Sequence, residues 1–264
     1  MSAQENDQFD TISSRGIEDG LYQSCMKSIR NAHFQANRLR AGLVLAGLFT
    51  DADLYREVIS LFYIVTSTME SKLEKLAKED DEICKKILKL GYNFTPHYES
   101  DLQYLYGKDW KEQVEACKNK SAVIMEYKEK IESMKSGIEI IGPCFVLWGA
   151  LIIGGVVAVM PKIEKLCGLK ACNIFKDITG PGRVQRRQEF IRVWDSLVDK
   201  TNGKNFSTAV KISEECMQCN NDIFTSLQRN PWWLGYVCAA SAVVVGGLSV
   251  VSVRWLFSAN RGKP

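Results

Sequence analysis

The chain has 264 residues, and 46% of them are hydrophobic, which is enough for a buried core in one large or two small domains. Its 34 basic and 31 acidic residues are mixed along the sequence and give a net charge of +3. A nucleic-acid-binding surface usually needs a dense basic tract, so this class of partner is excluded. Nine irregularly spaced cysteines follow a polar, acidic N-terminus that lacks the signal-peptide pattern, which predicts free thiols in a reducing, cytosolic environment.

Residues 1–16 are predicted to be a flexible N-terminus, and residues 17–229 a helical domain. The first helix carries His33 on an apolar line, whose other members are Leu21, Cys25, Ile29 and Ala36. A buried histidine on such a line is either a hydrogen-bonded core residue or a ligand of iron. The only other histidine, His97, follows a proline and is predicted at the surface. Two histidines exclude a multi-histidine metal centre but leave a cofactor with one histidine ligand, such as heme (haem).

The remaining domain is predicted to be all-α. Residues 55–90 have apolar positions at three- and four-residue spacings and predict one long amphipathic helix. Pro96 and Gly107 punctuate two further helices up to residue 134, and two more follow between residues 183 and 228. The close pair Cys216 and Cys219 has no second pair to complete a zinc site, so we interpret it as two free thiols on a helix.

An uncharged run of 20 residues, Ile141–Met160, interrupts this pattern. A helix of that length is long enough to cross a bilayer and equally suitable as a buried helix. Length alone leaves both alternatives open.

The segment 232–255 is predicted to be a transmembrane helix. Its uncharged core is bordered by Trp232, Trp233 and Trp255 and followed by Arg254 and other basic residues, which is typical of a membrane anchor. Only the short tail 256–264 follows, so we expect a tail anchor inserted after translation, with the body on the cytosolic side.

Two stretches resemble the heme oxygenase family. "AHFQANRLRAGL" resembles its H-x-Q-A helix, and "SDLQYLYGKDWKEQV" resembles its D-L-x-x-x-Y-G-x-x-W motif, with Asp101, Tyr106, Gly107 and Trp110 in place. The resemblance covers nearly the whole chain. It implies an all-α, heme oxygenase-like multi-helix domain with a C-terminal transmembrane helix, of the microsomal tail-anchored type in the endoplasmic reticulum. It also implies that His33 is the proximal ligand of the heme iron.

By the same resemblance, residues 141–160 hold a distal heme-covering helix rather than a second membrane span. Gly154 and Gly155 align with the family's paired glycines, which let a backbone approach heme closely, and Phe145 stands where a tyrosine is common. Arg187 aligns with a residue that holds a heme propionate. The neighbouring basic residues suit docking of an electron-donating NADPH–cytochrome P450 reductase.

One departure from the family leaves the function open. The distal helix of the family carries an aspartate that organises proton delivery to oxygen, and Leu151 occupies that position here, so no residue is assigned as catalytic. The first hypothesis is a heme oxygenase that converts heme, as substrate and cofactor, to biliverdin, iron and carbon monoxide with O2 and electrons from NADPH. The second is a heme-binding or heme-sensing membrane protein without the oxygenation chemistry. The third is a two-span membrane protein without heme.

Overall fold

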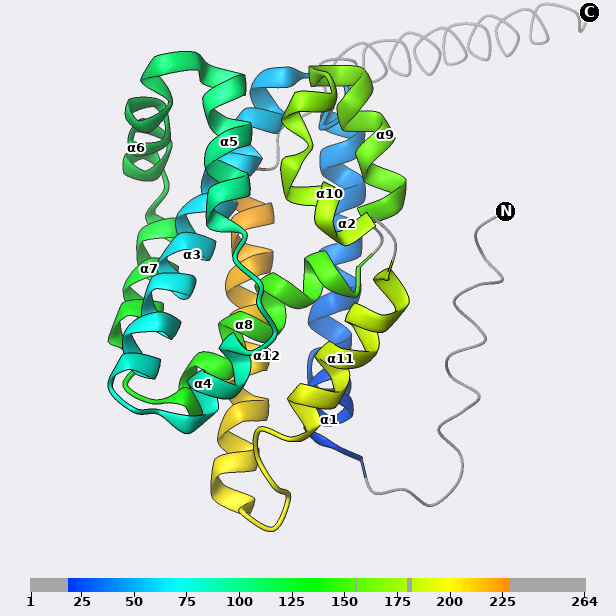
Figure 1. The fold of residues 1–264 in the computed structure, drawn as a ribbon. Coiled ribbons are helices and arrows are strands. Elements are labelled where there is room, and N and C mark those ends of the chain that lie inside the picture. The colour runs from blue at the N-terminus through cyan, green and yellow to red at the C-terminus, as the bar shows by residue number, and fades with distance from the viewer. Residues whose placement is uncertain (1–18, 155, 180–181, 228–264) are drawn as a thin grey trace, which may run out of the picture.

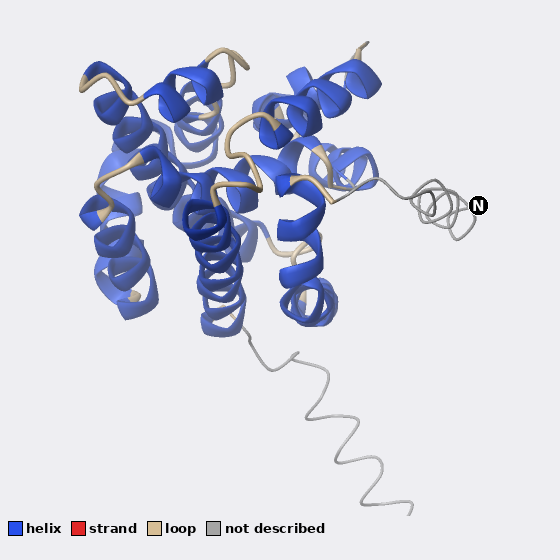
Figure 2. Cartoon of the chain, turned by 90° about the horizontal axis from the view of Figure 1, so that it is seen from below, coloured by secondary structure: helices blue, strands red, loops and turns tan. Residues whose placement is uncertain are grey.

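A computed structural model of the chain describes residues 19–154, 156–179 and 182–227. Every regular element in these ranges is a helix, which confirms the predicted all-α class (Figures 1 and 2). The predicted N-terminal segment 1–16, the membrane segment 232–255 and the tail 256–264 lie outside the described residues. The α-helices are α1 (Leu21–Ser28), α2 (Arg30–Ala46), α3 (Ala52–Lys78), α4 (Glu82–Leu88), α5 (Thr95–Tyr106), α6 (Trp110–Lys120), α7 (Ala122–Ser133), α8 (Gly137–Ile152), α9 (Val156–Cys167), α10 (Asn173–Thr179), α11 (Arg183–Asp195) and α12 (Gly203–Ser226), with the 3-10 turns η1 (Gly107–Asp109) and η2 (Leu169–Ala171).

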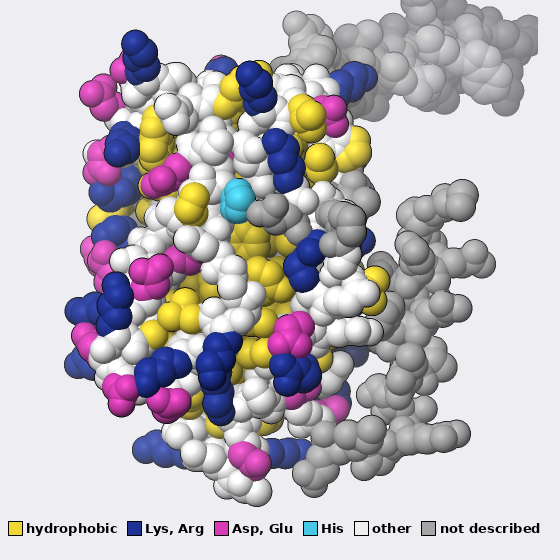
Figure 3. Space-filling view, in the orientation of Figure 1, with side chains coloured by type: hydrophobic (Ala, Val, Ile, Leu, Met, Phe, Trp, Pro, Cys, Tyr) yellow, Lys and Arg dark blue, Asp and Glu magenta, His cyan; other side chains and the backbone are white. Residues whose placement is uncertain are grey.

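Two long helices, α3 and α12, organise the bundle. α12 packs against α1, α2, α7 and α8, and α3 packs against α4 to α8. α8 approaches α12 closely at Gly142, where an added Cβ would lie 2.5 Å from Ile212 Cγ2. On the face seen in Figure 3, charged side chains of both signs lie mostly toward the periphery, and hydrophobic side chains show in the middle. The helices of the bundle therefore bury their apolar sides against α3 and α12.

The long helix α3 is shorter than the sequence predicted. Asp51 caps its N-terminus by accepting hydrogen bonds from the Asp53 and Leu54 amides at 2.9 and 3.3 Å. The helix ends at Lys78 instead of continuing to residue 90, because Asp80 adopts a left-handed conformation with φ of 74°. Asp81 then accepts from the Cys84 amide at 3.0 Å and starts α4. The expectation of one helix over residues 55–90 was wrong, because these local turns outweigh a continuous apolar pattern.

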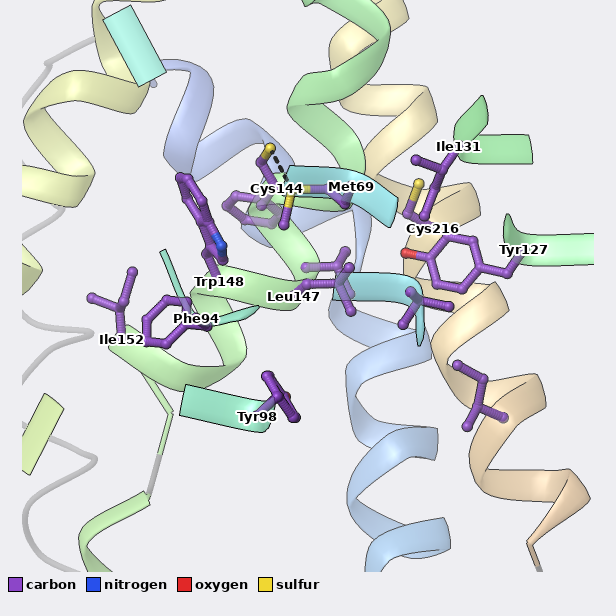
Figure 4. Close-up of a cluster of buried hydrophobic side chains, with 14 of the residues drawn as sticks. Met69, Phe94, Tyr98, Tyr127, Ile131, Cys144, Leu147, Trp148, Ile152 and Cys216 are labelled. Carbon is purple, nitrogen blue, oxygen red and sulfur yellow. Dashed lines mark hydrogen bonds between the residues drawn. The ribbon is translucent and has the colours of Figure 1, made fainter. Parts of the chain in front are cut away.

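A buried carboxylate, that of Glu70, ties α3 to α5 and α8. It accepts hydrogen bonds from the Phe94 amide at 2.8 Å, the Thr95 amide at 2.9 Å and Trp148 Nε1 at 3.0 Å. In Figure 4, Trp148 lies beside Phe94. Because a buried carboxylate is costly without such donors, this network determines where α8 lies on α3.

The Asp101–Trp110 motif is architectural in this structure. Asp101 is fully buried and accepts from the main-chain amides of Asn173 and Ile174 at 2.9 and 3.2 Å, which caps the N-terminus of α10. Burial raises the pKa of this carboxyl, and the hydrogen bonds from Asn173 and Ile174 oppose the rise. Gly107 adopts φ of 77° at the turn, and the Trp110 ring packs edge-on against Tyr63 at 5.7 Å. The motif thus joins α5 to α10 and α6 to α3.

The apolar run of residues 141–160 is divided between two helices. α8 ends at Ile152 and α9 begins at Val156. Most of α8 is buried in the core, including Cys144, whose thiol lies 3.1 Å from Met69 Sδ (Figure 4). Within the part of the chain that the structure describes, no helix combines the length and the apolarity needed to cross a membrane. The expectation of one continuous helix over this run was therefore wrong.

Candidate functional site

His33 lies on α2 with an exposed side chain. α1 ends at Ser28 and α2 starts at Arg30, so the predicted first helix is interrupted at Ile29. α2 then buries Ala36 and Leu43, in line with Ile29, and His33 lies about 40° around the helix from Ile29, at an angle of 100° per residue. The expectation that His33 is buried on the apolar line was wrong. The bundle covers only a narrow stripe of α2, whose buried residues are seven positions apart.

The pKa of His33 is lowered from its ordinary value. Desolvation by the surrounding protein is the larger cause, and the positive charge of Arg40 adds to it. Both favour the neutral imidazole, the form that binds a metal. A porphyrin brings four nitrogen ligands of its own, so its iron requires from the protein one accessible, neutral histidine of this kind. In the described ranges no three His, Cys, Asp or Glu side chains gather into a metal site.

Asn221 of α12 holds α2 in place at the residue that precedes His33. It is fully buried, and its Nδ2 donates to the main-chain oxygen of Ala32 at 2.9 Å and to Gln35 Oε1 at 3.5 Å. Further toward the C-terminal ends of both helices, the Arg40 guanidinium lies 5.9 Å from the centre of the Phe224 ring. Sequence reasoning missed Asn221, because the hydrogen bond joins segments 189 residues apart and no local pattern marks it.

Gly154 lies at the break between α8 and α9, where a side chain cannot be added without movement. A Cβ there would be 2.2 Å from the main-chain oxygen of Ala150. Arg183 Nη2 at the start of α11 donates to the Gly154 oxygen at 3.4 Å. Leu151 is half-buried and packs against the core on the last turn of α8. Gly155, the second predicted glycine, lies outside the described residues.

Phe145 belongs to an aromatic cluster that joins α1, α8 and α11. Its ring centre is 5.8 Å from that of Tyr22 and 5.9 Å from that of Trp194, and Trp194 stacks on Phe190 at 4.4 Å. Phe145 is 4% exposed, so it supports the packing of α8 against α11 and α1. A heme contact by Phe145 stays a prediction.

Arg187 is half-buried on α11, close enough to Tyr22 for its charge to matter. Burial raises the pKa of the Tyr22 hydroxyl, and the positive charge of Arg187 opposes this rise. Asp195 at the end of α11 accepts from the Tyr22 amide at 2.8 Å, which fixes α1 against α11. Arg187 therefore faces the α1 side of α11. Its contact with a heme propionate stays a prediction.

The close pair of cysteines predicted on one helix lies on α12. Cys216 and Cys219 are free thiols on α12, as predicted. Burial raises the pKa of Cys216 to about 12, so it stays protonated.

Comparison with known proteins gives the family. The sequence profile of the heme oxygenase family, described as "Heme oxygenase", matches residues 21–226. Heme oxygenase 1 of Nostoc is 33% identical over 75 residues, and heme oxygenase of Rhodella violacea is 29% identical over 83 residues. These matches cover 28% and 31% of this chain and span 31% and 34% of those proteins.

The fold is that of solved heme oxygenases. The structure of heme oxygenase 2 from Chlamydomonas reinhardtii without heme has a TM-score of 0.67 at 23% identity, covering 79% of this chain and 98% of that one. Heme oxygenase-1 from Synechocystis in complex with heme has a TM-score of 0.64 at 16% identity, covering 87% and 100%. Because the family profile spans most of the sequence, this chain belongs to the heme oxygenase family.

Proposed function

We propose that the chain is a heme oxygenase, an oxidoreductase that binds heme against α2 and cleaves it to biliverdin, iron and carbon monoxide. The observation that carries the proposal is His33: an accessible imidazole with a lowered pKa on the helix that Asn221 and Arg40 hold against α12. Bound heme iron supplies the oxygen activation. His33 would supply the imidazole that holds the heme iron.

The break between α8 and α9 is the proposed distal side of the site. Gly154 keeps this segment free of a Cβ, and the Arg183 guanidinium holds its main-chain oxygen. A backbone without side chains lets a planar ligand approach closely. In this proposal Gly155 has the same role, Arg187 holds a propionate and Phe145 supports α8 from the core.

A second function is favoured by Leu151. This side chain is apolar and half-buried at the position where the resemblance implies a proton-delivering aspartate. Leucine neither accepts nor donates a proton. The alternative is therefore a heme-binding or heme-sensing protein that does not complete the oxygenation.

One experiment separates these functions. The purified full chain is titrated with heme and the Soret band is recorded, and NADPH–cytochrome P450 reductase with NADPH is then added in air. Loss of the Soret band with formation of biliverdin establishes the oxygenase. A Soret band that persists under turnover supports the heme-binding alternative, and no Soret band rejects both.

The electron donor and the membrane complete the proposal. Arg183, Arg186 and Arg187 lie on α11, and their positive charge suits an acidic reductase surface, with an affinity that falls as salt rises. Residues 232–255 are proposed to anchor the chain as a tail anchor in the endoplasmic reticulum membrane, with the body on the cytosolic side. The apolar, tryptophan-bordered sequence of this segment supports the assignment.

A further inference from the structure

Four exposed large apolar side chains lie toward one end of the bundle. Val44 and Leu45 in the last turn of α2, Tyr104 in α5 and Leu169 in η2 are 40%, 63%, 49% and 50% exposed. Tyr104 adjoins η2, because its hydroxyl lies 3.2 Å from where a Cβ on Gly168 would be. The last turns of α2 and α5 and the turn after α9 are all at the upper end in Figure 1. Along the same edge in Figure 3, hydrophobic side chains lie among basic ones and some acidic ones.

α12 runs toward this end. Asn221 contacts Ala32 and Phe224 lies under Arg40, so α2 and α12 run in the same direction. α12 ends at Ser226, about level with Arg40, and α2 continues for another turn and a half to Ala46. Val44 and Leu45 are therefore exposed where α12 no longer covers α2. The uncharged run Leu234–Val253 follows α12 in the sequence after only a short connection.

Basic side chains lie beside the apolar ones on α9 and η2. Lys162, Lys165 and Lys170 are exposed on α9 and η2, and Glu164 is the only acidic residue in that stretch. Lys162 Nζ lies 4.9 Å from the centre of the Phe49 ring, in the turn that follows α2. Apolar side chains flanked by lysines are the composition of surfaces that lie in the headgroup region of anionic membranes.

We propose that this end, the lipid face formed by Val44, Leu45, Tyr104 and Leu169 with Lys165 and Lys170, rests on the headgroups of an anionic lipid bilayer. The inference depends on the proposed membrane segment and not on heme chemistry. Two attachments, the segment and the lipid face, fix the orientation of the body on the membrane. One attachment through a short connection leaves the body free to tilt.

Lysine labelling of the full chain in vesicles of phosphatidylcholine and phosphatidylserine tests the lipid face. A membrane-impermeant amine reagent is applied, and the modification of each lysine is divided by its value in the unfolded chain. Lys204, exposed at the opposite, N-terminal end of α12, is the internal reference. We expect labelling of Lys165 and Lys170 to fall severalfold relative to Lys204.

Variants identify the cause of that protection. Leu45→Glu combined with Leu169→Glu should restore the labelling of Lys170, because two carboxylates oppose contact with anionic lipid. Val184→Glu is the matched control, since Val184 is 63% exposed, as Leu45 is, but lies on α11. In this variant the labelling of Lys170 should equal that in the unchanged chain. The helix content measured by circular dichroism should stay the same in all variants.

Three outcomes would overturn the lipid face. Equal labelling of Lys170 and Lys204 in a chain that floats with the vesicles rejects it while retaining the membrane segment. Failure to float rejects both. Protection that increases with the protein-to-lipid ratio shows that a second copy covers the face. Heme titration of the same vesicles gives the Soret band separately, so a failed lipid face and a failed heme function are distinguished.

Discussion

At the scale of single residues, Leu151 determines which of the two proposed functions holds. A leucine at the proposed distal side excludes water and carries no proton, whereas acid–base groups typically contribute about 10²–10⁴-fold to such steps. The side chain is half-buried on the last turn of α8, so a polar replacement can reach solvent. A substitution at this position can therefore change proton delivery without dismantling the core.

Leu151→Asp is expected to raise biliverdin formation by about 10-fold or more if proton delivery is what limits turnover. Partial burial of the carboxylate should cost about 1 kcal/mol of unfolding free energy. The rate is measured with reductase and NADPH, and the stability by urea unfolding. Leu151→Asn is the control of equal size that carries no titrating proton. An Asn variant as fast as the Asp variant would show that pocket polarity, and not proton transfer, was limiting.

Asn221 and Asn220 are neighbouring buried residues with different surroundings. Asn221→Ala removes the hydrogen bond to Ala32 and should lower the unfolding free energy by about 1–3 kcal/mol. It should also weaken heme binding, because the part of α2 that carries His33 is no longer held against α12. Asn220→Ala is the matched control, since the Asn220 side chain makes no hydrogen bond to α2 within the described residues, and it should affect stability alone. Equal heme affinities in the two variants, measured by titration, would remove Asn221 from the site.

At the scale of elements, helix positions followed from the sequence and helix ends did not. The three- and four-residue spacing correctly placed α3, and every described element is a helix. The ends of α3 and α8 depend on single turns, at Asp80 and near Gly154, that an apolar pattern does not register. The exposure of His33 was missed for a related reason: how much of the circumference of α2 is covered depends on how α12 packs against it, which is tertiary information.

The break between α8 and α9 yields a paired prediction. Gly154→Ala places a Cβ against the Ala150 oxygen and should destabilise the fold by about 2 kcal/mol, since the backbone itself must move. Gly149→Ala, inside α8, meets nothing closer than Phe190 Cζ at 3.9 Å and should be neutral or stabilising by about 0.5–1 kcal/mol. Urea unfolding of both variants measures the difference. If both variants are equally stable, the chain at Gly154 is not held as the structure has it.

At the scale of the whole molecule, heme binding should raise the free energy of unfolding. The proposed site draws on α2, α8, α9, α11 and α12, which come from both halves of the chain, so a ligand that contacts several of them binds only the folded state. Such a ligand at a concentration of 100 times its dissociation constant adds about 2.7 kcal/mol. For a domain of this size, that gain corresponds to a rise in Tm of about 5–10 °C.

Thermal unfolding of the full chain with saturating heme should therefore show this rise. Iron-free protoporphyrin, which has the same ring but takes no axial ligand, is the control and should give a smaller shift. Equal shifts would mean that the ring packs against the protein without a bond to His33. No shift with either ligand would speak against a folded heme site.

The most direct measurement for the central claim is the Soret spectrum of His33→Ala beside that of His97→Ala. Because His33 is the accessible imidazole on α2, His33→Ala should lose the histidine-ligated spectrum and regain it when imidazole is added. His97→Ala, at the start of α5, should keep the original spectrum. An unchanged spectrum in His33→Ala, or a loss in His97→Ala, would contradict the assignment of α2 as the helix that holds heme.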